Sequence, residues 1–174
     1  AKKSALEVVF TVLHAGGKFG DGGYKISGGL PGVGASVVNA LSVWLEVEIK
    51  VDGGVYRQRY ERGKAVAPLE KVGTCRKNDT GTKVTFLPDG EIFEKTRFKS
   101  DAIKSRMHET TYLNPGLTIH FEDKRSGSEE KITYSEPDGI KAYVKELNNG
   151  KEAVTDIIYF KKSEDGIEVE CAFQ

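Results

Sequence analysis

The chain lacks an excess of charge of either sign, because its 26 Lys and Arg residues are balanced by 26 Asp and Glu residues among 174. A protein that is drawn to a phosphate backbone by charge alone carries a large positive excess. The balance excludes that mode of binding for the chain as a whole, so any contact with nucleic acid must be local or indirect.

Cysteine is scarce, and the two that occur, Cys75 and Cys171, lie far apart without a C-x-x-C spacing. This argues against a zinc site or a disulfide framework and suits a reducing cytosol. No apolar run approaches the roughly 20 residues that span a bilayer, and no signal peptide is present. We therefore expect a cytoplasmic protein with no membrane partner.

The start of the chain, Ala1-Lys2-Lys3, has no initiator Met, which suggests a cut within a larger protein. Ser4 is a natural N-cap and Glu7 completes a capping box. Apolar residues at helical spacing predict a first helix that ends near His14.

Glycine is concentrated in one segment, because nine of the 20 glycines fall between Gly16 and Gly34, in GGKFGDGGYKISGGLPGVG. Val33, Val37, Val38 and Leu41 form an apolar stripe that predicts a helix over about 32–42. Backbone N–H groups at such a junction can bind anionic oxygens, although a flexible connector is the commoner use of such a loop. No Gly-Lys-Ser/Thr follows, and the Rossmann spacing is absent, so the pattern fits neither of those phosphate loops.

Beyond this segment the apolar period changes to two over Leu45–Val51, and Asp52-Gly53-Gly54 predicts a turn into a partner strand over 55–62. Sheet and helices share one body, so the predicted fold class is α+β. A domain boundary is expected near 150–155. The remaining predicted elements are strands at 66–72, 82–87, 116–122, 129–134, 157–160 and 167–173, and helices at 100–113 and from Pro137-Asp138-Gly139 to Asn148-Asn149-Gly150.

Three segments carry a resemblance to a known family: His14–Phe19, Tyr24–Leu30 and Gly32–Ser42. Their order and spacing resemble the nucleotide lid and phosphate motif of the DNA gyrase B family, bacterial type II topoisomerases of the GHKL ATPase group. The resemblance covers essentially the whole chain. It continues through Tyr56-Arg57-Gln58, Thr80-Gly81-Thr82, Phe121–Arg125 and Asp165–Val169.

The resemblance implies a GHKL (Bergerat-type) two-layer sandwich of helices on a mixed, mostly antiparallel sheet. Residues 1–150 would be the ATP-binding domain without its N-terminal part. Residues 151–174 would be the first strands of a transducer domain with a ribosomal S5-like fold.

The same resemblance implies an ATP site. Lys18, next to Gly17, would approach the phosphates, Tyr24 would lie on the adenine side, and Thr82 would form the floor of the adenine pocket. Without the resemblance, Thr82 is equally well read as a β-branched strand residue, and Lys18 as a solvated loop lysine. The main-chain contacts to the triphosphate would come from Gly29, Leu30, Pro31, Gly32, Val33 and Gly34.

Two departures from the family pattern qualify this site. Pro31 stands where the family usually has histidine, and proline has no N–H to donate, so we expect weaker nucleotide binding. The family's general-base glutamate, its magnesium-binding asparagine and its adenine-reading aspartate would precede Ala1, and the second domain's lysine would follow Gln174. No catalytic or metal-binding residue is therefore assigned, although ATP and Mg²⁺ are the implied cofactors.

For the parent protein the resemblance implies ATP-dependent DNA supercoiling by passage of one duplex through another. The implied partners are the A protein of DNA gyrase in a heterotetramer, DNA through the intact enzyme, and a second copy through the ATPase region. The alternatives are the B protein of topoisomerase IV and a binding module that keeps the fold without using nucleotide.

Overall fold

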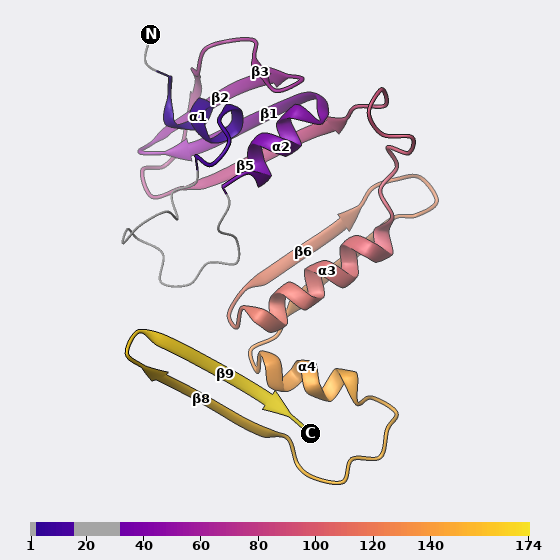
Figure 1. Ribbon diagram of the computed structural model, residues 1–174. Helices are drawn as coiled ribbons and strands as arrows, with labels where there is room; N and C mark the ends of the chain where they lie inside the picture. The colour runs from indigo at the N-terminus through magenta and orange to yellow at the C-terminus, as the bar shows by residue number, and fades with distance from the viewer. Residues whose placement is uncertain (1–2, 16–31) are drawn as a thin grey trace. The chain divides into compact units, whose positions relative to one another are not determined.

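The protein is α+β in the computed structural model, with antiparallel sheets and short helices (Figure 1). The structure describes residues 3–15 and 32–174. The chain forms two compact units, Ala1–Thr96 and Arg97–Gln174. Within the described ranges, no helix has the length and apolar character needed to cross a membrane.

Helix α1 (Ala5–Thr11) opens the first unit, and its start is as predicted. Ser4 Oγ accepts a hydrogen bond from the Glu7 backbone N–H at 3.1 Å, which satisfies one of the free donors of the first turn. The predicted end near His14 is wrong. Val12 already takes an extended conformation, with φ −116° and ψ 128°, so the helix has only two turns.

The sheet of the first unit has the strand order β3-β2-β1-β5, and β4 pairs with β2. The predicted hairpin is confirmed, with Leu45 opposite Tyr60 and Asp52 and Gly53 at positive φ in the turn. The predicted strand at 66–72 is wrong over residues 66–69, which lie between two short strands, β3 and β4. The strands are β1 (Ser42–Val51), β2 (Gly54–Glu61), β3 (Lys64–Ala65), β4 (Glu70–Thr74) and β5 (Gly81–Pro88).

The core of this unit lies between the sheet and α1. Leu45, Val47 and Tyr60 have no exposed surface, and the ring of Phe10 from α1 stacks on Tyr60 with 5.7 Å between centroids. Helix α2 (Gly34–Ala40) lies beside α1 on the sheet (Figure 1). Two helices and one sheet face thus enclose a small apolar core.

The opposite face of the sheet is charged. Glu46 on β1 is opposite Arg59 on β2, and Glu48 is opposite Arg57, so unlike charges face each other across the hairpin. The Arg59 guanidinium also lies 4.8 Å from the ring centroid of Trp44, a cation–π contact. This face carries the chain's single tryptophan.

The second unit begins with α3 (Ser100–Leu113), whose bounds agree with the prediction, and continues through two hairpins separated by a helix. Asn148 is the C-cap residue of that helix, and its side-chain Nδ2 donates to Gln174 Oε1 at 2.8 Å, which ties the helix to the residue after the last strand. The other elements are β6 (Thr118–Asp123), β7 (Glu130–Ser135), α4 (Ile140–Leu147), β8 (Ile158–Glu164) and β9 (Ile167–Phe173).

A buried carboxylate joins α3 to β6. The Asp123 side chain, only 5% exposed, accepts a hydrogen bond from Arg125 Nε at 2.9 Å and one from Ser100 Oγ at 2.7 Å. Arg125 Nη1 also donates to the Phe98 carbonyl at 2.7 Å. These hydrogen bonds, with the guanidinium first among the causes, hold the pKa of Asp123 far below its ordinary value.

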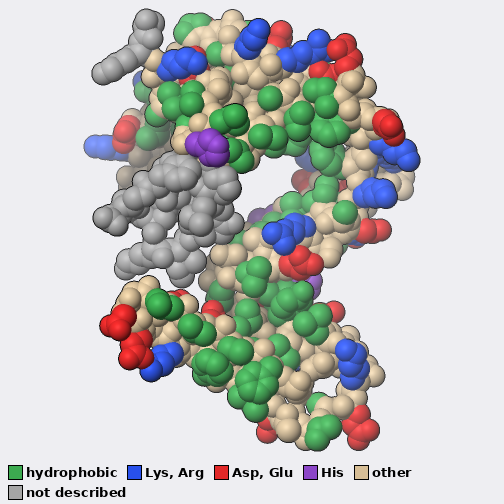
Figure 2. All heavy atoms as spheres, viewed as in Figure 1, with side chains coloured by type: hydrophobic (Ala, Val, Ile, Leu, Met, Phe, Trp, Pro, Cys, Tyr) green, Lys and Arg blue, Asp and Glu red, His purple; other side chains and the backbone are tan. Residues whose placement is uncertain are grey.

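Apolar side chains are exposed in both units (Figure 2). Val84 and Phe86 on β5 are 43% and 40% exposed, and Ile158 and Phe160 on β8 are each 48% exposed. Surface of this kind often marks a contact with other protein.

Candidate functional site

Thr82 lies on β5 opposite Ile49 of β1, as the predicted strand required. Because strand residues alternate between faces, Thr82 shares a face with Val84 and Phe86, and this is the face that carries Leu45 and Val47 on β1. Thr82 is itself exposed. Its hydroxyl is therefore accessible on the helix-bearing side of the sheet, where a ligand could reach it.

The end of the glycine-rich segment lies at the start of α2. Gly32 has a φ of +60°, Val33 is the N-cap of the helix, and Gly34 is its first residue. A Cβ added at Gly34 would meet no atom of the described residues within 4 Å, so among them the backbone there is open to close approach. The Ser36 hydroxyl donates to the Val33 carbonyl at 3.0 Å and fixes this turn.

Residues next to Gly34 and Thr82 pack against the same apolar cluster. Ala35, next to Gly34, packs against the core cluster that contains Phe10 and Leu45, and so does Ile49, the strand partner of Thr82. Two of the predicted site segments, about 50 residues apart in the chain, thus border one core.

The other predicted site residues fall in residues 16–31, outside the described ranges. Of the ten predicted ATP contacts, the structure places Gly32, Val33, Gly34 and Thr82. The remaining six are Gly17, Lys18, Tyr24, Gly29, Leu30 and Pro31.

The buried face of α2 differs from the apolar stripe that the sequence suggests. Ser36 and Asn39 are the buried side chains of this helix, whereas Val37 and Val38 are 40% and 37% exposed. Sequence reasoning missed Asn39, and its one signal was an amide inside a run of apolar residues. The Asn39 Nδ2 donates to the Phe10 carbonyl at 2.8 Å.

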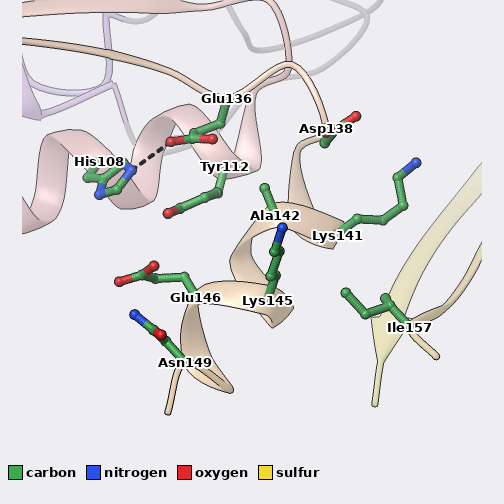
Figure 3. Close-up of a pocket in the computed structure, with 10 residues that line it drawn as sticks. All are labelled: His108, Tyr112, Glu136, Asp138, Lys141, Ala142, Lys145, Glu146, Asn149 and Ile157. Carbon is green, nitrogen blue, oxygen red and sulfur yellow. Dashed lines mark hydrogen bonds and ion pairs between the residues drawn. The ribbon is translucent and has the colours of Figure 1, made fainter. Parts of the chain in front are cut away.

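A separate pocket of about 640 Å³ lies in the second unit, around His108, Tyr112 and Glu136 (Figure 3). His108 Nε2 lies 2.8 Å from Glu136, and the His108 ring contacts Tyr112 and Tyr134. Acidic and basic groups are mixed in the lining, with Glu146 near Lys145. His108 is thus held between the Glu136 carboxylate and two tyrosine rings.

Within residues 3–15 and 32–174, no group of three His, Cys, Asp or Glu side chains is arranged to hold a metal ion. Cys75 and Cys171 are free thiols. His120 contacts the Thr133 hydroxyl at 2.8 Å.

No family model matches the sequence. The chain is 54% identical over 180 residues to the DNA gyrase B protein of Thermotoga maritima, a match that covers 99% of this chain and 28% of that protein. It is 52% identical over 170 residues to the DNA topoisomerase 4 B protein of Streptococcus pneumoniae, covering 97% and 26%. The chain therefore spans between a quarter and a third of the length of these curated relatives.

Solved structures agree with these relatives. The 43K ATPase domain of Thermus thermophilus gyrase B, in complex with an aminocoumarin, superposes with a TM-score of 0.81 at 34% identity, covering 98% of this chain and 42% of that one. The topoisomerase IV ATP-binding domain of Francisella tularensis, in complex with a small-molecule inhibitor, gives 0.72 at 31% identity, covering 95% and 42%.

The fold is thus that of a GHKL ATPase domain, an α+β body of helices on antiparallel sheet. At 52–54% identity over nearly its whole length, the chain belongs to the family of B proteins of the bacterial type II topoisomerases, gyrase and topoisomerase IV.

Proposed function

We propose that this chain is the ATP-binding region of the B protein of a bacterial type II DNA topoisomerase, which uses ATP to pass one DNA duplex through another. The observation that supports this most is identity above 50% across nearly the whole chain to the gyrase and topoisomerase IV B proteins. We take gyrase, and therefore ATP-dependent supercoiling, as the first candidate and decatenation by topoisomerase IV as the second. An enzyme of this kind would work in the bacterial cytoplasm.

The described part of the site fits a nucleotide at two positions. Gly34 offers backbone without a Cβ and with open space before it, and Thr82 offers an exposed hydroxyl on the same side of the sheet. Backbone N–H groups suit phosphate oxygens, and a hydroxyl can donate to or accept from a base. In this proposal Lys18 with Gly17, Tyr24, and the main chain of Gly29 to Val33 complete the contacts.

Magnesium fits the described residues poorly, because they hold no cluster of acidic side chains suited to a metal ion. We therefore derive no step of the reaction through Mg²⁺ and assign no catalytic residue. The metal ligand and the general base belong, in this proposal, to polypeptide outside this chain.

The partners and domains follow the same proposal. The A protein of gyrase would complete a heterotetramer, DNA would bind to the intact enzyme, and two ATPase regions would dimerise. Residues 1–150 would form the ATP-binding domain without its N-terminal part, and residues 151–174 would begin the transducer domain.

The test is calorimetric titration of the protein with a non-hydrolysable ATP analogue and magnesium, with circular dichroism to establish folding. Binding that saturates at one nucleotide per chain is expected. A folded sample that binds none would favour the alternative of a nucleotide-inactive module. Assays of the assembled enzyme on relaxed circles and on linked circles then separate supercoiling from decatenation.

A further inference from the structure

Asn39 makes the one side-chain hydrogen bond observed between the two helices of the first unit, within the described residues. Its amide Nδ2, on α2, donates to the carbonyl oxygen of Phe10, on α1, at 2.8 Å. The two residues are 29 positions apart, and Asn39 has no exposed surface. The bond is therefore buried and joins elements on either side of residues 16–31.

Both partners of this bond are held by other contacts. The Phe10 side chain belongs to the core cluster, and its carbonyl is among the last four of α1, which have no N–H partner within a helix that ends at Thr11. Next to Asn39 at the C-terminal end of α2, a Cβ on Gly63 would lie 3.3 Å from Ala40 Cα, so this end of the helix packs tightly against the β2–β3 turn. The Asn39 bond therefore links two helices that each have further contacts with the sheet.

Only one of the two polar atoms of the Asn39 side chain is hydrogen-bonded to a described residue. Its Oδ1 is buried and has no hydrogen-bond partner among residues 3–15 and 32–174. A buried acceptor without a partner lowers stability, whereas an apolar residue of similar size would not carry that cost. The amide at this position is therefore explained by the single bond that it donates to α1.

We propose that Asn39 is a positioning residue for nucleotide binding. It holds α2 against α1 and thereby fixes, through the helix, the backbone at Gly32–Gly34, the described part of the predicted phosphate-binding site. This inference rests on the proposed function. Asn39 acts through the backbone of its neighbours and does not contact the nucleotide.

Gln58 supplies a matched control. It is also a fully enclosed amide of the first unit, and its Nε2 donates to the Ala67 carbonyl at 3.1 Å, while its Oε1 accepts from the Tyr60 hydroxyl. One bond joins β2 to the segment after β3 and the other lies within β2, so neither is made to α1 or α2. Gln58→Met removes a comparable amide-to-carbonyl bond, together with the bond from Tyr60, and leaves the bond between α1 and α2 in place.

The experiment compares Asn39→Leu and Gln58→Met in the protein as its gene encodes it, assembled with its partner protein. Both variants are expected to lose stability in urea unfolding. Asn39→Leu should raise the KM for ATP roughly tenfold with little change in kcat, and weaken analogue binding to match, whereas Gln58→Met should leave both unchanged. Asn39→Ser, a milder change that keeps a donor, should give a smaller effect and replaces the first variant if that variant does not fold.

Equal nucleotide parameters in the Asn39 and Gln58 variants would overturn the inference and leave the proposed function intact. A wild-type protein that binds no nucleotide would overturn the proposed function, and with it the role in binding. Hydrogen exchange then decides whether the Asn39 bond itself holds α2 against α1. The Val12 and Val37 amides should exchange faster in Asn39→Leu only. Unchanged exchange in that variant would contradict this structural role of Asn39 as well.

Discussion

At position 34 the helix would favour alanine, whereas the approach of a bound phosphate to the backbone would need glycine. Gly34 is the first residue of α2, its φ is not in the left-handed region, and an added Cβ meets nothing within 4 Å in the part of the chain that the structure describes. A helix gains up to about 1 kcal/mol when Ala replaces Gly. The fold therefore does not require glycine here, and close approach of a ligand is the remaining reason for it.

We predict that Gly34→Ala raises the free energy of unfolding slightly and weakens binding of an ATP analogue by about tenfold or more, because the methyl group occupies the approach to the backbone. Urea unfolding and calorimetry measure the two effects. Gly73→Ala is the control, since its Cβ would make ordinary contact with Val55 at 3.7 Å, far along the chain from α2. Undiminished affinity in Gly34→Ala would argue against phosphate contact at this backbone.

Thr85, on the same strand as Thr82, supplies a matched control for a substitution at Thr82. Thr82→Val removes the hydroxyl and keeps the β-branched shape, so stability should change by less than about 0.5 kcal/mol. Affinity for the ATP analogue should fall roughly fivefold, as expected for one hydrogen bond. Thr85, which pairs with Glu46, lies on the opposite face of β5, and Thr85→Val should leave affinity unchanged. If both variants bind like wild type, Thr82 is only a strand residue.

Pro31 lies outside the described residues, and its effect remains a prediction from chemistry. Proline has no N–H, so one main-chain donor is missing from the proposed phosphate site. Pro31→His should therefore raise affinity for the ATP analogue severalfold in calorimetry. Equal affinity of the two proteins would mean that this position supplies no phosphate contact.

Among the elements, α3 is joined to β6 through the Asp123 carboxyl group, which titrates in acid. Because hydrogen bonds lower the pKa of Asp123 in the folded state from its ordinary value of 3.8, its ionised form stabilises the fold. That contribution is fully present at neutral pH. It is lost as the pH falls below about 3.8 and the carboxylate is protonated.

We predict that Asp123→Asn lowers stability near pH 7 and flattens the loss of stability between about pH 4 and 2. Hydrogen exchange over β6 and α3, read at several pH values, measures both effects. Glu122→Gln on the same strand is the control. Its carboxylate pairs with a largely exposed Lys131 at 2.9 Å, so its contribution should be small. An acid profile identical to wild type in Asp123→Asn would contradict the assignment.

The helices and strands also show which features of the fold can be predicted from the sequence. The hairpin at Asp52-Gly53, the strand carrying Thr82 and the helix at 100–113 follow from local patterns, and the structure confirms them. The predicted strand at 66–72 forms only from Glu70 onward, because Pro68, just before it, cannot donate to a ladder. The buried face of α2 could not be predicted, since it depends on the Phe10 carbonyl 29 residues away.

For the candidate site, local pattern indicated only a phosphate-binding possibility at the glycine-rich segment. Thr82 was assigned through resemblance, because an isolated threonine on a strand carries no functional signal. That Gly34 and Thr82 border one core required the pairing of β1 with β5 and the packing of Ala35, both long-range contacts. Periodicity in a sequence contains no record of such contacts.

On the scale of the whole molecule, packing divides the chain between Thr96 and Arg97, whereas the proposed domain boundary lies near residue 150. The two divisions answer different questions. The first records where internal contacts are dense, and the second, which stays a proposal, concerns domains in the evolutionary sense.

Trp44 lies beneath the Arg59 guanidinium in the first unit, and no other tryptophan occurs in the chain. Its fluorescence is therefore a built-in optical reporter of residues 1–96 alone, without a dye or a label. Circular dichroism, by contrast, averages over both units. A denaturation followed by both signals would show whether the two units melt as one cooperative block or in succession.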